Sequence, residues 1–242
     1  MTKVGIIAAM EVEAELLKSS MPSVRTHHHM STEFCEGRLG PTDVVVVRSG
    51  IGKVNAAMCA QVLVSVFGVS HVINTGIAGS LDARIDIGDL VVSVDAVQHD
   101  MDATNFGYEP GVVPQMPIGS FFRADEGLRA RALAAARACV PAVGVFEGRV
   151  LSGDCFVADE EVKHCLVEGF QGLCCEMEGA AIAHACALNR VPFVVVRAIS
   201  DKADGSASMD YPVFEEQAAR HCALVVRHMV EHLSEDAGTP AP

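Results

Sequence analysis

The stretch from Phe193 to Asp201 constrains the fold most strongly, because an apolar run there delivers an arginine and then an aspartate. The three valines at 194–196 are typical of a strand that is buried on both faces, as in a parallel sheet. Ligands of such sheets bind beyond the carboxyl ends of the strands. We therefore expect Asp201 to lie at a ligand site on one edge of an α/β sheet.

Strand and helix patterns alternate along the whole chain, which is typical of an α/β fold. No linker rich in Pro, Gly or Ser divides the chain, so we predict one domain over residues 1–234 and a disordered tail over 235–242. Strands are expected at Lys3–Ala9, Glu33–Leu39, Asp43–Arg48, Val69–Asn74, Leu90–Gln98 and Val143–Leu151, and helices from about Glu11 and at Val54–Phe67, Arg123–Cys139, Ala158–Val167, Glu178–Leu188 and Val213–Leu233.

Composition and charge limit the possible partners. Apolar residues make up 50% of the chain and aromatics only 5%, so the core must be built from Val, Ala, Leu and Ile. The net charge of −13 argues against nucleic acid or an anionic membrane as the main partner. No signal peptide or membrane-spanning stretch is evident, and the nine scattered cysteines are typical of free thiols in a reducing cytosol. We expect a cytoplasmic protein that binds a small molecule.

Two glycine-rich segments follow apolar strands, Ser49–Val54 and Asn74–Ser80. Glycines permit tight turns and close backbone approach, and amides at a helix start can hold polar groups. Neither segment has the spacing of a P-loop or of a dinucleotide fingerprint. We interpret them as two turns that form a cleft at one sheet edge.

Acidic residues stand at two further strand ends. Glu11 and Glu15 are suited to complement a helix dipole, whereas Glu13 points elsewhere at helical spacing and is a candidate for the cleft. Glu176 and Glu178 follow an apolar strand whose register carries at least one of them inward. A buried carboxylate requires a partner, and we expect a sugar hydroxyl, water or an arginine.

Two histidine segments invite a metal interpretation. His27–His29 is a run of three in a polar segment, but consecutive residues of regular structure cannot all face one ion, so we interpret it as a solvated loop. His99 with Asp100 and Asp102 precedes several prolines, which is more typical of a long loop over a site or a subunit interface.

Six motifs in one order resemble a known family, the 5'-methylthioadenosine/S-adenosylhomocysteine nucleosidases of the purine nucleoside phosphorylase superfamily. The resemblance covers residues 3 to about 233. It implies a three-layer α/β/α sandwich with a central mixed, mostly parallel sheet, a homodimer with sites at the interface, and no metal or organic cofactor. The motifs lie at 5–13, 49–54, 74–79, 152–154, 176–178 and 197–201.

The resemblance also implies a role for each acid in hydrolysis of an N-glycosidic bond. Asp201 matches the general acid at the adenine N7, and Glu13 matches the residue that activates water, with Arg197 beside that water. Glu178 matches the carboxylate that holds the ribose hydroxyls. Such a reaction builds negative charge on the base and positive charge on the ribose, which an acid and a carboxylate respectively stabilise.

Other positions match substrate-binding residues of the family. Phe156 resembles the ring stacked on the base, with the Val157 backbone beside it, and Met177 packs against the sugar. Phe106 and Pro114 match positions that the partner subunit supplies. Ile77 departs from a more usual Ser, and Tyr211 from a more usual Phe. The remaining positions expected at the substrate are Glu176, Ser200, Ile51, Ala78, Gly79, Tyr211 and Phe214.

Three alternatives stay open beside this interpretation. A phosphorylase would use phosphate in place of water, but Asn74-Thr75 stand where such enzymes carry an arginine, and Glu13 would repel the dianion. A futalosine or aminodeoxyfutalosine hydrolase would use the same acids. An inactive nucleoside-binding protein is the third, although Glu13, Glu178 and Asp201 are all present.

Overall fold

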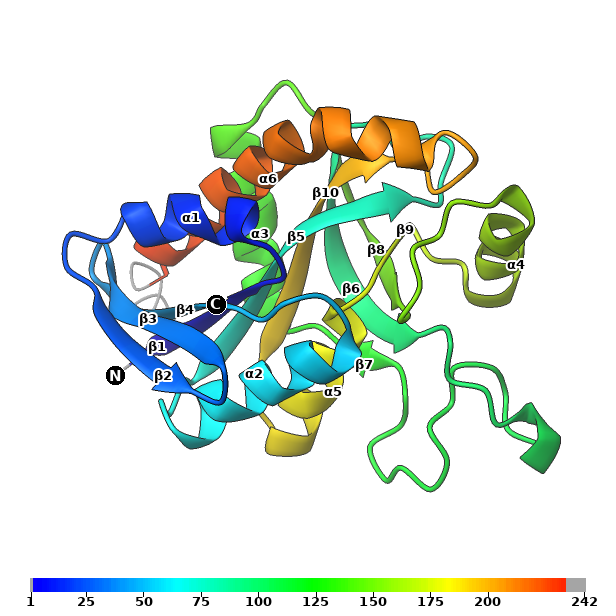
Figure 1. Cartoon of the computed structure of the whole chain (residues 1–242), viewed down its shortest axis with the longest axis horizontal. Coiled ribbons are helices and arrows are strands. Elements are labelled where there is room, and N and C mark those ends of the chain that lie inside the picture. Colours follow the sequence, from blue (N-terminus) through cyan, green and yellow to red (C-terminus); the bar gives the residue numbers. More distant parts are fainter. Residues whose placement is uncertain (1, 234–242) are drawn as a thin grey trace, which may run out of the picture.

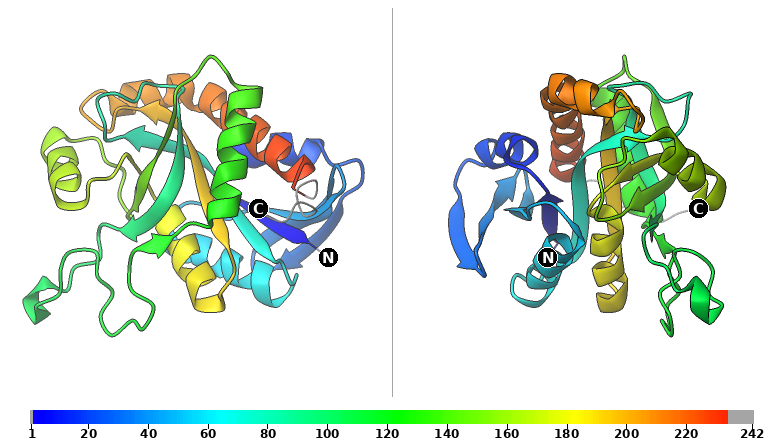
Figure 2. Two further views of the ribbon diagram at one scale, coloured as in Figure 1. Left: turned by 180° about the vertical axis from the view of Figure 1, so that it is seen from behind. Right: turned by 45° about the vertical axis from the view of Figure 1, so that its right-hand side comes forward.

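A ten-stranded sheet lies between two groups of helices in the computed structural model, which describes residues 2–233 (Figure 1). Helices α1, α3 and α6 cover one face, and α2 and α5 cover the other (Figures 1 and 2). The strands are β1 Lys3–Ala8, β2 Arg25–His29, β3 Thr32–Leu39, β4 Thr42–Arg48, β5 His71–Ser80, β6 Leu90–Gln98, β7 Phe122–Arg123, β8 Val145–Ser152, β9 Cys174–Glu176 and β10 Phe193–Asp201. The helices are α1 Glu11–Ser19, α2 Lys53–Ser65, α3 Glu126–Cys139, α4 Glu160–Phe170, α5 Gly179–Asn189 and α6 Ala207–Glu231, with a 3₁₀ turn at Thr104–Phe106.

The sheet is mixed, as expected. Its order is β10-β6-β8-β9-β5-β1-β4-β3-β2, with β7 paired to β6 and an additional pairing between β10 and β5. That extra pairing closes β5, β10, β6, β8 and β9 into a ring of strands. The parallel pairs β4–β1, β1–β5 and β5–β10 are consecutive, so their carboxyl ends meet at one edge.

Strand β10 is buried along all nine of its residues, as its run of valines predicts. Helices α5 and α6 contact it, so side chains on either face avoid water. Its register with β5 pairs Arg197 with Gly76 and Asp201 with Gly79, with an irregularity between Ile199 and Asp201. The polar end of β10 therefore lies beside the glycines of β5.

The boundaries of two elements, β5 and α6, differ from the sequence-based expectation by more than three residues. Asn74–Ser80 is the second half of β5 and not a glycine-rich turn. The glycines there leave room for side chains of other elements to lie against the strand. Helix α6 begins at Ala207 and not at Val213, and it carries Pro212 inside its first turns.

The interpretation of His27–His29 as a solvated loop was wrong, because these residues form β2 and pair with β3. His27 and His29 lie on the same side of the strand, and their rings contact Phe67 at centroid distances of 5.4 and 5.5 Å. His27 Nε2 also lies 3.0 Å from Glu36 Oε2. Strand pairing with β3 and ring contacts with Phe67 hold this segment in a strand despite its polar composition.

Two further expectations concern the ends of the chain and membranes. The predicted tail at 235–242 lies outside the described residues. Within residues 2–233, no helix has both the length and the apolar character that crossing a membrane requires.

Candidate active site

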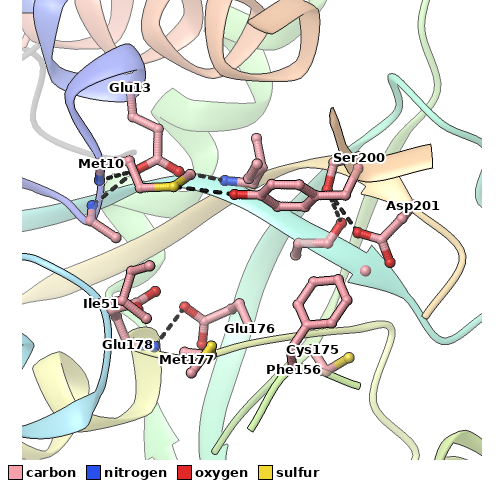
Figure 3. Close-up of a pocket in the computed structure, with 15 residues that line it drawn as sticks. Met10, Glu13, Ile51, Phe156, Cys175, Glu176, Met177, Glu178, Ser200 and Asp201 are labelled. Carbon is pink, nitrogen blue, oxygen red and sulfur yellow. Dashed lines mark hydrogen bonds between the residues drawn. The ribbon is translucent and has the colours of Figure 1, made fainter. Parts of the chain in front are cut away.

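A cavity opens at the carboxyl ends of β5 and β10, beside β9 and the first turn of α1 (Figure 3). Its carboxylates are separated in space: Asp201 lies at one end, and Glu13 and Glu178 lie toward the other (Figure 3). The lining residues are Ala9, Met10, Glu13, Ile51, Ile77, Ala78, Gly79, Phe156, Cys175, Glu176, Met177, Glu178, Ser200, Asp201 and Tyr211.

Asp201 ends β10 with a side chain that is almost fully buried. One carboxyl oxygen accepts a hydrogen bond from Ser200 Oγ at 2.9 Å, and the other accepts one from the Ala203 amide at 2.8 Å. Burial raises the pKa of Asp201, these two hydrogen bonds oppose that shift, and the negative charges of Asp210 and Asp204 add to it. A raised pKa favours a carboxyl group that holds a proton to donate.

Glu13 reaches the cavity because it is the third residue of α1. From that position its carboxylate turns back and accepts hydrogen bonds from the amides of Ala9 at 2.8 Å and Met10 at 2.9 Å. This is the reciprocal half of a helix capping box. A third amide, that of Ile77 on β5, donates at 3.1 Å. Burial raises the pKa of Glu13, and Arg197 and the three amides oppose that shift.

Glu178 and Glu176 have different partners although they are two residues apart. Glu176 accepts hydrogen bonds from Ser152 Oγ, from Arg197 and from the amides of Glu178 and Gly179 at the start of α5. Its carboxylate is therefore occupied by the protein itself. Glu178 accepts only the Gly52 amide at 2.9 Å among side-chain bonds of the described residues. It keeps acceptor capacity for a ligand.

Arg197 is the cation of this end of the cavity and is 1% exposed. Its Nη2 donates to Glu176 Oε2 and, at 2.5 Å, to Asn74 Oδ1, and it lies 3.9 Å from Glu178 Oε2. Burial alone would lower the pKa of Arg197, but the charges of Glu176, Glu178 and Glu13 reverse that, so it stays protonated. Burial and the nearby Glu176 in turn raise the pKa of Glu178 to about 7, against the effect of Arg197.

Two glycines of β5 allow the acids to approach the strand. A β-carbon at Gly76 would lie 2.6 Å from both Arg197 Nη1 and Glu13 Oε1. A β-carbon at Gly79 would lie 2.7 Å from Asp201 Oδ1. A real β-carbon does not lie that close to another heavy atom, so each glycine makes room for one end of the site.

Aromatic and sulfur-containing side chains form the apolar walls. Phe156, which is 51% exposed, meets Tyr211 edge-on at a centroid distance of 5.7 Å. The Tyr211 hydroxyl donates to Met10 Sδ at 3.1 Å. Val157 is buried and lines a smaller adjoining hollow together with Phe156 and Asp201. A flat aromatic group fits between such walls.

The turn at Gly52 is held by a motif that the sequence analysis left without a role, Ser152–Asp154. Asp154 accepts the Lys53 amide at 2.8 Å, and its own amide donates to Asp100 at 3.0 Å. Asp100 also pairs with Lys53 Nζ at 2.6 Å. These contacts fix the Gly52 amide that binds Glu178. Asp100 is thus a structural partner of this turn.

Of the positions expected at the substrate, Val157 lines only the adjoining hollow, and three more lie outside both the cavity and that hollow in this one chain. Phe214 is on α6 but not among the lining residues, and Phe106 and Pro114 are on the segment that projects from the body (Figure 1, lower right). Phe106 is 83% exposed. The last two were expected to serve a partner's cavity, and their position on a projecting segment is compatible with that expectation.

Three lining residues were not singled out from the sequence: Ala9, Met10 and Cys175. Each adjoins a motif that was, since Ala9 and Met10 precede the helix of Glu13 and Cys175 precedes Glu176. Apolar or sulfur side chains carry no signal of their own in a sequence. All nine cysteines are free thiols. Among residues 2–233, no group of three or more His, Cys, Asp or Glu side chains is arranged to hold a metal ion.

Chemically, the cavity combines a buried acid at one end with carboxylates and an arginine at the other. That arrangement suits cleavage of a bond that leaves negative charge on one fragment and positive charge on the other. Figure 3 shows Asp201 at one end and Glu13 and Glu178 toward the other, so different groups serve the two functions.

Comparison with known proteins identifies the family. The model of the phosphorylase superfamily matches residues 3–231. A 5'-methylthioadenosine/S-adenosylhomocysteine nucleosidase of Chromohalobacter salexigens is 41% identical over 237 residues, covering 96% of this chain and 98% of that protein. The chain belongs to this nucleosidase family. The resemblance of the six motifs is thereby confirmed.

Solved structures agree with that assignment. The nucleosidase of Neisseria meningitidis, crystallised with methylthio-immucillin-A, superimposes with a TM-score of 0.91 at 38% identity, covering 96% of this chain and 99% of that one. A futalosine hydrolase of Helicobacter pylori superimposes with a TM-score of 0.90 at 34% identity, covering 96% of this chain and 98% of that one. The nucleosidase fold is confirmed, and both nucleosidases and a futalosine hydrolase share it.

Proposed function

We propose that this chain hydrolyses the N-glycosidic bond of 5'-methylthioadenosine and S-adenosylhomocysteine, and also of 5'-deoxyadenosine, to release adenine. The observation that carries the proposal is the separation of the acids within one cavity: Asp201 at one end, Glu13 and Glu178 with Arg197 toward the other. The family membership of the chain supports this substrate class.

Asp201 is the acid for the leaving base in this proposal. Negative charge develops on the purine as the bond to the ribose lengthens, and protonation at N7 neutralises it. Burial raises the pKa of Asp201, which favours the protonated form that the step requires. The Phe156 ring stacks on the base, and the Val157 backbone and Ser200 complete the contacts at this end.

Glu13 activates the water that attacks the anomeric carbon, with Arg197 nearby. Glu13 Oε1 and Arg197 Nη1 both lie beside Gly76, so the carboxylate is near the guanidinium. Glu178 holds the ribose hydroxyls, and Met177 packs against the sugar. Positive charge develops on the ribose, and the excess of carboxylates over the one arginine at this end stabilises it.

Glu176 acts through other residues in this proposal. Its carboxylate is bonded to Ser152, Arg197 and the amides at the start of α5. It therefore fixes Arg197 and the backbone of Glu178, and we assign it a positioning role beside the substrate. Ile51, Ala78 and Gly79 supply the remaining wall of the cavity.

A chromatographic assay of the purified protein tests this function. Methylthioadenosine incubated without phosphate is expected to yield adenine and methylthioribose. Added phosphate is expected to change neither the rate nor the products. Strict dependence on phosphate, with a sugar phosphate as product, would establish a phosphorylase instead. The buried Arg197 is already paired with carboxylates, which disfavours binding of a phosphate dianion there.

A second candidate is hydrolysis of futalosine or aminodeoxyfutalosine. The observation that favours it is the similarity to the Helicobacter pylori futalosine hydrolase, at 34% identity over nearly the whole chain. The same acids would serve, because the bond broken again joins a purine to ribose, and aminodeoxyfutalosine differs from methylthioadenosine only in its 5' substituent. Including aminodeoxyfutalosine in the assay separates the two, since the ratio of kcat/KM values ranks them.

We also propose that the chain is one nucleosidase domain over residues 1–234 and works as a cytoplasmic homodimer. One sheet runs through the described residues, and free thiols suit a reducing compartment. Val54 on α2 and Leu188 on α5 are 70% and 59% exposed beside each other around an apolar hollow. Burying them with Phe106 against a second copy would remove this apolar surface from water. An active monomer in light scattering would refute the dimer.

A further inference from the structure

The hydroxyl of Tyr211 is a polar group in the cavity that the proposed mechanism does not use. Its described hydrogen bond is to Met10 Sδ at 3.1 Å. A thioether sulfur is a weak acceptor, so this contact replaces little of the hydration that the hydroxyl loses. Burial is also the largest cause of the raised pKa of Tyr211, which keeps the phenol a neutral donor. A ligand atom that accepts better than sulfur would take this hydrogen bond.

The position of the hydroxyl relative to a bound nucleoside follows from the proposed function, on which this inference rests. The base lies between Phe156 and Asp201, and the ribose hydroxyls face Glu178. In a ribonucleoside the 5' carbon and the 2' and 3' hydroxyls lie on opposite faces of the ribose ring. Met10, the partner of Tyr211, lies across the cavity from Glu178 (Figure 3). The Tyr211 hydroxyl therefore faces the 5' substituent.

Different 5' substituents would meet this hydroxyl differently. A methylthio group offers a thioether, which merely replaces the thioether of Met10. A 5' methyl group offers no acceptor. A 5' oxygen offers a stronger acceptor than either, and it can donate in return to Met10 Sδ.

We propose that Tyr211 is a specificity-determining residue, whose hydroxyl forms a polar subsite for a 5' oxygen and extends the substrate class to 5'-hydroxy nucleosides such as adenosine. Met10, Ile51 and Ile77 contribute apolar side chains to the lining, and the charges that act on Tyr211 are negative, that of Glu13 among them. A carboxylate cannot donate a hydrogen bond, so without the Tyr211 hydroxyl a 5' oxygen would lose its donor there.

The test is the substitution Tyr211→Phe, which removes the hydroxyl and keeps the ring that contacts Phe156. For wild type and variant, kcat/KM is measured with methylthioadenosine, and adenosine and 5'-deoxyadenosine are compared both as substrates and as competitive inhibitors. A net hydrogen bond is worth about 0.5–1.5 kcal/mol, so the preference for adenosine over 5'-deoxyadenosine should fall roughly 2- to 12-fold in the variant. The methylthioadenosine to 5'-deoxyadenosine ratio should stay within about twofold.

Ser19→Ala is the control, because it removes a hydroxyl at the exposed end of α1 that donates to the Leu16 carbonyl of the same helix. It should leave the ratios unchanged. An adenosine preference that Tyr211→Phe does not alter, or a wild type that neither binds nor cleaves adenosine, would overturn the inference. A wild type that releases adenine from no nucleoside would instead refute the proposed function, so the two failures are distinguishable.

Discussion

The two ends of the cavity bury carboxyl groups under opposite electrostatic conditions. Asp201 has only neutral hydrogen-bond donors, Ser200 and the Ala203 amide, and the charges that act on it most are negative. Glu13 and Glu178 share the positive charge of Arg197. Burial disfavours the ionised form at both ends, but a cation opposes it at only one of them. The one arginine thus favours negative charge at its own end of the cavity, while nothing positive opposes a proton on Asp201 among the causes of its raised pKa.

Removing the acid end should have the largest effect. Asp201→Asn keeps the shape and an acceptor for the Ala203 amide but cannot donate the proton, so kcat should fall on the order of 10²- to 10⁴-fold while nucleoside binding persists. Single-turnover kinetics and calorimetric titration with methylthioadenosine measure the two quantities. Asp204→Asn, the same change three residues downstream, should keep its turnover. Near-normal kcat in Asp201→Asn would remove Asp201 as the acid.

Removing the cation of the other end should lower the free energy of unfolding. Arg197→Met would leave Glu13, Glu176 and Glu178 buried without a counter-charge, and breaking such a group typically costs about 3–5 kcal/mol. Urea unfolding measures the loss. Arg220→Met is the control, because its pair with Glu216 is exposed on the surface of α6 and should contribute about 1 kcal/mol or less. Equal losses in the two variants would contradict a special role for burial at Arg197.

The pH dependence of stability sharpens the comparison further. Glu178 has an ordinary pKa of 4.5 and a raised one of about 7 in the folded protein, so the folded state binds the proton more tightly. The stability that protonated Glu178 contributes is therefore fully present below about pH 4.5, and it is lost as the pH rises through about 7. Glu178→Gln should gain stability relative to wild type between pH 5 and 8, by about 1–3 kcal/mol.

Thermal or urea unfolding across that pH range measures this gain. Glu216→Gln, which changes an exposed glutamate on α6, should show no such trend. A stability difference between Glu178→Gln and wild type that does not vary with pH would mean that Glu178 is ionised throughout.

The backbone of the site was predictable from the sequence, because it depends on local patterns. The valines of β10 predicted a doubly buried strand, and the spacing of Glu13 from Glu11 and Glu15 made it, of the three, the candidate for the cleft; Glu13 is buried in the structure. Both features depend on the periodicity of a single element. The prediction of a loop at His27–His29 was wrong because these histidines pack on Phe67, which lies in a distant segment of the chain. A local pattern does not contain that contact.

The division of labour between Glu176 and Glu178 was not predictable. Both follow the same strand, and only the three-dimensional contacts show that Glu176 is bonded to Ser152, Arg197 and the start of α5 while Glu178 keeps acceptor capacity. The glycines of β5 were likewise expected in turns. Their use as space for Asp201, Glu13 and Arg197 depends on a β5–β10 register that no local pattern encodes.

The central claim is that Asp201 holds a proton near neutral pH while Glu13 does not. Infrared difference spectroscopy at pH 7 in a Glu178→Gln background tests it directly, because a protonated carboxyl has a carbonyl band of its own and Glu178, with a pKa of about 7, would otherwise contribute one. That band should be lost in Asp201→Asn and retained in Glu13→Gln. A band that persists in Asp201→Asn, or that disappears in Glu13→Gln, would contradict the assignment of the two ends.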